Sequence, residues 1–333
     1  MVVVCEDRIR TLSSSVVNGL VDIHKLWAPK TEVLPKWFID ALSVPREEGY
    51  VEVANARLHY FRWGKRGNPP LLMAHGFLSH ARCYAFIAPF FASRYDVIAY
   101  DLSGMGDSSA REESSLAVHG QEMIAISKEL GLFDSGRKPV VVAHSFGGCV
   151  ALEAADAAPK CFEGLIICDM MTLPPEILEE FRKTSRIRPR PFNPNKPVHV
   201  YPEYQMARDR YILSPDQPVA EPFLLEYMAY HSLLQVQDGW RWKFSPNIFN
   251  RTDESYTIGS KLVAVPEKKA IIYGEQSRLF TDESRAYVHR LGGGNIPMIA
   301  VPHAHHHLML DQPLAFVTAI RAVMEQWEAA IER

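Results

Sequence analysis

Short apolar runs alternate with stretches of helical spacing along most of the chain from residue 48 onward. The runs Leu71–Ala74, Tyr95–Tyr100, Pro139–Ala143 and Gly164–Cys168 lead into His75, Asp101, His144-Ser145 and Asp169. Between them, helices are predicted over Ala81–Ala92, Leu116–Leu130 and Phe146–Ala158. This alternation predicts an α/β fold with a mostly parallel sheet and helices on both faces. Because functional groups gather at the carboxyl ends of such strands, these polar positions are expected at one edge of the sheet.

The N-terminal part of the chain does not share this rhythm. Residues 1–47 predict a helical extension, with amphipathic stretches at 13–27 and 34–42. Two short strands, Val51–Ala54 and Arg57–Trp63, are expected to form a hairpin joined at Asn55-Ala56.

A second interruption divides the predicted core. Residues 170–257 are rich in proline and aromatic residues and predict a mainly helical insertion, with a helix near 221–234 and a Trp240-Arg-Trp242 cluster. The alternation then resumes with runs at 270–273 and 297–301 and helices near 281–291 and 314–332. We therefore expect a core formed by residues 48–169 and 258–333, with 170–257 as a cap.

Composition and charge restrict the partners. The 333 residues include 36 Lys+Arg and 39 Asp+Glu, and the formal net charge of -3 gives no electrostatic reason to expect nucleic acid. No apolar run reaches the roughly 18 residues that a membrane span needs. The early charges in the first ten residues are unlike a secretory signal. Five cysteines without a CxxC pair are typical of free thiols in a reducing compartment, which predicts a cytoplasmic protein.

The strongest chemical signal is Ala143-His-Ser-Phe-Gly-Gly148, between an apolar run and a predicted helix. A small residue two positions before the serine and a glycine two positions after it allow a very tight strand-to-helix turn. Such a turn raises the Ser145 hydroxyl above the sheet, at a helix N-terminus whose dipole favours negative charge. Ala143 takes the place of the first glycine in the usual G-x-S-x-G pattern.

Several motifs occur in an order that resembles the α/β-hydrolase fold superfamily, over about residues 50–333. They are His75-Gly-Phe77, Asp101-Leu-Ser-Gly-Met-Gly-Asp-Ser108, the turn at Ser145, and Ala304-His-His-His-Leu-Met-Leu-Asp-Gln-Pro313. The resemblance implies a capped, carboxylesterase-like serine hydrolase that needs no cofactor. It also implies an oxyanion hole formed by the backbone amides of Phe77 and Phe146.

The family pattern points to the catalytic base within the histidine run. Counting five positions back from Asp311 gives His306, and His305 is the alternative. A metal site is not expected there, because no carboxylate or cysteine cluster completes one.

The sequence indicates the catalytic acid less clearly than the base. Many family members carry an aspartate where this chain has Ser277 and Arg278. We expect Asp169, at the end of an earlier core strand, to serve instead, with Glu275 as the alternative. Either carboxylate would have to fix the imidazole tautomer and stabilise the imidazolium.

These residues predict a hydrolase in which Ser145, His306 and Asp169 cleave a carboxylic ester or lactone of a small, fairly apolar substrate through an acyl-enzyme. Gly76, His144 and Trp240 are expected at the substrate site. The serine argues against epoxide hydrolases and haloalkane dehalogenases, which use aspartate at this position.

Alternative functions stay open at this point. One is a ligand-binding or signalling protein on the same scaffold, and another is a C–C bond hydrolase, a lyase or a cofactor-free oxygenase. The N-terminal extension is expected either to pack on the cap or to form a homodimer contact.

Overall fold

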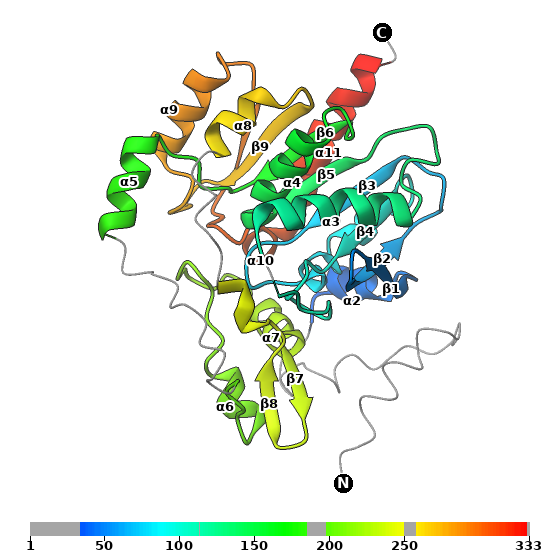
Figure 1. The fold of residues 1–333 in the computed structure, drawn as a ribbon, viewed down its shortest axis with the longest axis vertical. Helices are drawn as coiled ribbons and strands as arrows, with labels where there is room; N and C mark the ends of the chain where they lie inside the picture. The colour runs from blue at the N-terminus through cyan, green and yellow to red at the C-terminus, as the bar shows by residue number, and fades with distance from the viewer. Residues whose placement is uncertain (1–33, 113, 185–197, 250–257, 332–333) are drawn as a thin grey trace.

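An eight-stranded mixed sheet forms the centre of the molecule (Figure 1). The computed structural model describes residues 34–112, 114–184, 198–249 and 258–331. The strands are β1 (Glu47–Val53), β2 (Ala56–Trp63), β3 (Pro70–Ala74), β4 (Asp96–Tyr100), β5 (Val140–His144), β6 (Gly164–Cys168), β9 (Lys268–Gly274) and β10 (Met298–Val301). Their spatial order is β1-β2-β4-β3-β5-β6-β9-β10. β2 pairs antiparallel with β1 and β4, and the neighbours from β4 to β10 pair parallel.

Helices cover both faces of the sheet. One face carries α3 (Leu116–Glu129), α4 (Phe146–Ala157), α8 (Ile258–Ala264) and α9 (Asp282–Leu291), and the other carries α2 (Lys36–Ser43) and α11 (Pro313–Ile331) (Figure 1). Leu72 packs with the α3–α4 side, whereas its neighbours Leu71 and Met73 pack with the α11 side. Successive strand residues thus pack against opposite cores. For this reason β3 and β6 are apolar throughout and fully buried, and β4 is fully buried and apolar after Asp96.

The hairpin at the sheet edge differs from its prediction by one residue. Val53 pairs with Ala56, and the turn residues are Ala54 and Asn55, with φ of 43° and 67°. The turn is therefore Ala54-Asn55, because both of its central residues must adopt positive φ to match the twist of the strands. The predicted helix at 34–42 is found as α2, and the stretch 13–27 lies outside the described residues.

The single helix predicted over Ala81–Ala92 is wrong. The chain forms two short 3-10 turns there, η2 (Ala81–Tyr84) and η3 (Ala88–Phe90). Pro89 has no backbone N–H and disfavours a continuous helix through this stretch.

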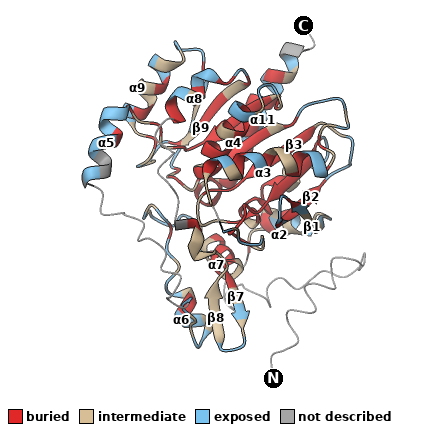
Figure 2. Cartoon of the chain, in the orientation of Figure 1, coloured by how far each residue is buried: buried red, intermediate tan, exposed pale blue. Residues whose placement is uncertain are grey.

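Residues 170–257 leave the sheet after β6 and return before α8, and we call them the inserted segment. They contain α5 (Pro175–Thr184), α6 (Tyr204–Arg208), α7 (Pro222–His231), the 3-10 turn η4 (Pro246–Phe249) and a hairpin of β7 (Leu233–Val236) and β8 (Gly239–Trp242). The predicted helix 221–234 thus ends at His231, and the Trp240-Arg-Trp242 cluster lies on a strand. Figure 2 shows that burial is concentrated in the sheet and its helices, whereas β8 is only half-buried.

The short helix α10 (Leu308–Asp311) follows the histidine run and had no counterpart in the predicted elements. None of the helices in the described ranges combines the length and apolarity required to cross a membrane.

Candidate active site

Ser145 lies in a sharp turn between β5 and α4. Its φ of 51° and ψ of -116° are uncommon for a residue with a side chain, so the surrounding structure must hold this conformation. Ser145 N donates to Cys168 O at 2.8 Å, and Gly148 N donates to Ser145 O at 2.9 Å. At Gly147, a Cβ atom would lie 2.6 Å from the backbone oxygen of Ala74, so only glycine fits. The turn therefore fixes the serine immediately before the first residue of α4.

Asp169 and His306 form a buried pair. Asp169 Oδ1 lies 2.9 Å from His306 Nδ1, and the two residues are 0% and 3% exposed. Asp169 directly follows β6, and its N–H donates to Ile272 O at 2.8 Å. Because a carboxylate only accepts hydrogen bonds, Nδ1 of His306 carries the proton of this bond.

Two further donors fix the Asp169 carboxylate. Gly274 N donates to Oδ2 at 2.7 Å, and Ser277 Oγ donates to Oδ1 at 2.6 Å. Ser277 stands where many family members carry their acid, so here a hydroxyl at that position supports a carboxylate from another strand. The sequence offered a signal for this role, because Ser277 marked the departure from the common pattern.

His144 connects the serine turn to the histidine loop. Its Nε2 lies 2.8 Å from His306 O, and the two imidazole rings are 4.7 Å apart between centroids. Burial, with His306 and His307 nearby, lowers the pKa of His144 well below its usual value, so the neutral ring donates to this carbonyl. Ser145 follows His144, and its N–H bonds Cys168, which precedes Asp169, so the backbone segments that carry the three predicted triad residues meet here.

The loop after β3 packs directly on the serine turn. At Gly76, a Cβ atom would lie 2.9 Å from His144 Nδ1 and 3.4 Å from Ser145 Cβ. The rings of Phe77 and Phe146 meet edge to face, with centroids 5.6 Å apart. The two residues predicted to supply the oxyanion-hole amides are therefore neighbours in space.

His75 stabilises the loop after β3 through two hydrogen bonds of its ring. Leu102 N donates to His75 Nε2 at 3.1 Å, which leaves the ring proton on Nδ1 to bond Gly76 O at 2.7 Å. Burial lowers the pKa of His75, in agreement with a neutral ring that shapes the loop.

The alternative site residues have other partners. Glu275 is exposed, and its carboxylate accepts from His303 N at 3.1 Å. His305 N donates to Asp311 Oδ2 at 2.7 Å, and the His305 ring nitrogen Nδ1 lies 3.7 Å from the same oxygen. Trp240, on β8, is half-buried and packs its ring on Tyr204 at 5.2 Å. A substrate contact by Trp240 stays a prediction.

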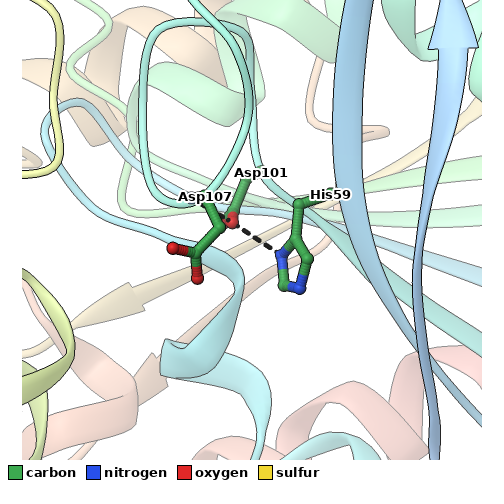
Figure 3. Close-up of side chains that lie close together, drawn as sticks. All are labelled: His59, Asp101 and Asp107. Carbon is green, nitrogen blue, oxygen red and sulfur yellow. Dashed lines mark hydrogen bonds and ion pairs between the residues drawn. The ribbon is translucent and has the colours of Figure 1, made fainter. Parts of the chain in front are cut away.

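A second histidine–aspartate pair involves His59 and Asp101, with Asp107 beside it (Figure 3). The ligand atoms of these three side chains lie within 4.8 Å of one another, as a metal site would require. However, His59 Nδ1 bonds Asp101 at 2.8 Å and its Nε2 bonds Glu48 at 3.1 Å. Burial alone would lower the pKa of His59, but these two carboxylates raise it to about 9. A protonated imidazole has no lone pair for a metal.

The charges of this cluster are balanced by protein groups. Asp107 pairs with Lys243 at 2.6 Å and with Arg82 at 3.7 Å, and Asp101 accepts from the backbone N–H groups of Ala81 and Asp107. Lys243 follows β8, so the cluster also ties the inserted segment to the core. We interpret it as a structural charge network that organises the loop after β4.

Known proteins share this fold and parts of this sequence. A family model described as the alpha/beta hydrolase family matches residues 71–319. A putative esterase/lipase of Haemophilus influenzae is 29% identical over 108 residues, which are 32% of this chain and 36% of that protein. Human epoxide hydrolase 4 is 31% identical over 123 residues, which are 35% of this chain and 33% of that protein. The match thus spans less than half the length of these curated relatives.

The solved structures extend the likeness to most of the chain. The crystal structure of E-2-(acetamidomethylene)succinate hydrolase has a TM-score of 0.70 at 18% identity and covers 84% of this chain and 100% of its own. At this identity the likeness concerns the fold alone. The family match across residues 71–319, which is more than half of the chain, shows that the chain belongs to the alpha/beta hydrolase family.

Proposed function

We propose that the protein is a serine hydrolase that cleaves the ester-like bond of a small, fairly apolar substrate. The observation that carries this proposal is the buried Asp169–His306 pair, bonded through His144 to the strained turn at Ser145. A carboxylate-oriented imidazole beside a serine at a helix N-terminus is the arrangement that activates a hydroxyl as a nucleophile.

In the proposed first half-reaction, Ser145 Oγ attacks the carbonyl carbon and its proton passes to His306 Nε2. Asp169 stabilises the imidazolium that forms. The carbonyl oxygen becomes negative and accepts hydrogen bonds from the amides of Phe77 and Phe146, each worth about 10²–10³ in rate. The C–O bond to the alcohol then breaks, and the alcohol leaves with the proton from Nε2.

In the second half-reaction, water takes the place of the alcohol. His306 Nε2 accepts a proton from the water as its oxygen attacks the acyl carbon. The bond to Ser145 Oγ breaks, the proton returns to Ser145, and the carboxylic acid is released. The proton of Ser145 leaves with the alcohol, and a proton from water replaces it, so the cycle balances with water as the co-reactant.

The preference for an apolar substrate is supported by the side chains near the turn. Phe77 and Leu78 are half-buried and pack with Phe146 against the same apolar core. Serine at position 145 favours ester chemistry over epoxide opening, which uses an aspartate nucleophile in related enzymes.

The test compares wild type and Ser145→Ala on a panel of p-nitrophenyl esters and lactones. We expect the substitution to reduce turnover by up to about 10⁶, as for serine hydrolases without their nucleophile. Ser93→Ala, at an exposed serine, is the matched control and should leave the rate unchanged. Equal turnover by wild type and a folded Ser145→Ala protein would refute the proposal. Tight ligand binding by a wild type without turnover would favour the binding-protein alternative.

A further inference from the structure

Gln217, in the inserted segment between α6 and α7, is hydrogen-bonded to the loop that carries His306. Its Nε2 donates to Asp311 Oδ1 at 2.9 Å and to Oδ2 at 3.0 Å. Its Oε1 accepts from His307 N at 3.1 Å. Residues 216 and 218–220 are exposed, whereas Gln217 is half-buried. One side chain thus links two points of the histidine loop to the inserted segment.

The peptide group between His306 and His307 is bonded at both ends. Its carbonyl oxygen bonds His144 Nε2 at 2.8 Å, and its N–H donates to Gln217 at 3.1 Å. His144 directly precedes the predicted nucleophile, and Gln217 belongs to the inserted segment. The backbone that carries His306 is therefore held between the serine turn and the segment predicted to be a cap.

Asp311 connects Gln217 to a second point of the histidine loop, the backbone of His305. It is 3% exposed, and its Oδ2 also accepts from His305 N at 2.7 Å. Burial raises the pKa of Asp311, and the bonds from His305 and Gln217 oppose that rise. An amide is needed at position 217, because it must donate to a carboxylate and accept from an N–H at once.

We propose that Gln217 is a positioning residue, which holds the His306 backbone so that the imidazole faces Ser145 and makes turnover depend on contact between the inserted segment and the core. This inference rests on the proposed function for its kinetic consequence. The contact itself is a property of the structure and is open to a separate measurement.

The chemistry of the contact provides a specific test. In Gln217→Glu, two carboxylates face each other, and they remain close only while they share a proton. As the pH rises the proton is lost, and repulsion separates the inserted segment from the loop. In the double variant Gln217→Glu/Asp311→Asn the roles are exchanged. The new amide at position 311 would donate to the new carboxylate at position 217 and accept from His305 N. The carboxylate would still accept from His307 N, so both backbone bonds and one bond between residues 217 and 311 are kept.

The kinetic experiment measures kcat and KM for p-nitrophenyl esters across pH. Gln217→Ala should lower kcat by about 10- to 100-fold, the cost of a misplaced catalytic group, with a much smaller change in KM. Gln217→Glu should lose activity relative to wild type as the pH rises, and the exchanged double variant should recover most of it. Gln235→Ala, at an exposed glutamine on β7, is the control and should match wild type.

Hydrogen exchange tests the contact between Gln217 and the histidine loop independently of turnover. Backbone amides in residues 303–311 should exchange roughly two- to tenfold faster in Gln217→Ala, as expected for a lost hydrogen bond, and return towards wild type in the double variant. If wild type shows no Ser145-dependent turnover, the proposed function fails while the exchange still tests the contact. Unchanged exchange in Gln217→Ala, or unchanged kcat in an enzyme that depends on Ser145, would overturn the positioning role.

Discussion

His306–Asp169 and His59–Asp101 are two buried histidine–aspartate pairs with nearly the same internal geometry. In each pair, Nδ1 lies 2.8–2.9 Å from an aspartate oxygen. The difference is at the second ring nitrogen. His59 Nε2 bonds Glu48, whereas Asp169 is the one carboxylate hydrogen-bonded to His306 among the described residues.

This difference separates the proposed catalytic base, His306, from His59, which we interpret as a protonated structural group. Two carboxylates raise the pKa of His59 to about 9 against the effect of burial, so its ring stays protonated at neutral pH and binds loops together. A single carboxylate orients an imidazole and leaves Nε2 able to accept a proton. The number of acidic partners, more than burial or the aspartate distance, distinguishes the proposed catalytic pair from the structural one.

The strongest test of this comparison is Asp169→Asn. An amide would no longer fix the proton on Nδ1 of His306, so we expect kcat for ester hydrolysis to fall by about 10⁴, as for the same change in a serine protease triad. The measurement is steady-state turnover of a p-nitrophenyl ester, with circular dichroism to check the fold.

The matched control is Glu275→Gln, at the alternative acid. Its exposed carboxylate accepts from the His303 backbone, so this variant should hydrolyse esters at nearly the wild-type rate. A crippled Glu275→Gln beside an active Asp169→Asn would reverse the assignment of the acid.

Local sequence determines much of the core and of the site. The apolar runs predicted the strands β3 to β6, and small residues around Ser145 predicted the turn, because both follow from neighbours in the chain. The meeting of Asp169 with His306, 137 residues apart, was expected from a family pattern and the strand end.

Other features depend on contacts that carry no local signal. The network of His59 draws on Glu48 and Arg82 of the core and on Lys243 of the inserted segment, which lie far apart in the chain. The bonds of Gln217 are of the same kind. The prediction of one helix over Ala81–Ala92 was wrong because it followed the helical spacing of the apolar residues and gave too little weight to Pro89.

A second prediction concerns stability and tests the cationic state of His59. Its pKa of about 9 in the folded protein exceeds the ordinary value of about 6.5, so its stabilising effect is complete below pH 6.5 and is lost as the pH rises through 9. We expect the free energy of unfolding to fall by at most about 3 kcal/mol over this interval. Denaturant unfolding at pH 6.5 and 9.5 measures it.

His59→Gln is the control for that measurement, because it removes the titrating ring. The variant should be less stable than wild type at pH 6.5 and should lose less stability between the two pH values. An equal pH dependence in both proteins would show that His59 is not the group that releases the proton.

The smallest expected effect concerns Ser277, which gives Asp169 a side-chain donor, whereas Asp101 takes its donors from the backbone and from His59. Ser277→Ala removes the 2.6 Å bond to Asp169 Oδ1 but keeps the 2.7 Å bond from Gly274 N to Oδ2. One lost bond to a charged group predicts a roughly tenfold or greater fall in kcat. Ser277→Thr keeps the hydroxyl and should restore the rate. Because Ser277 Oγ also accepts from Leu279 N and Phe280 N, a loss of thermal stability without a change in kcat would limit its role to the turn.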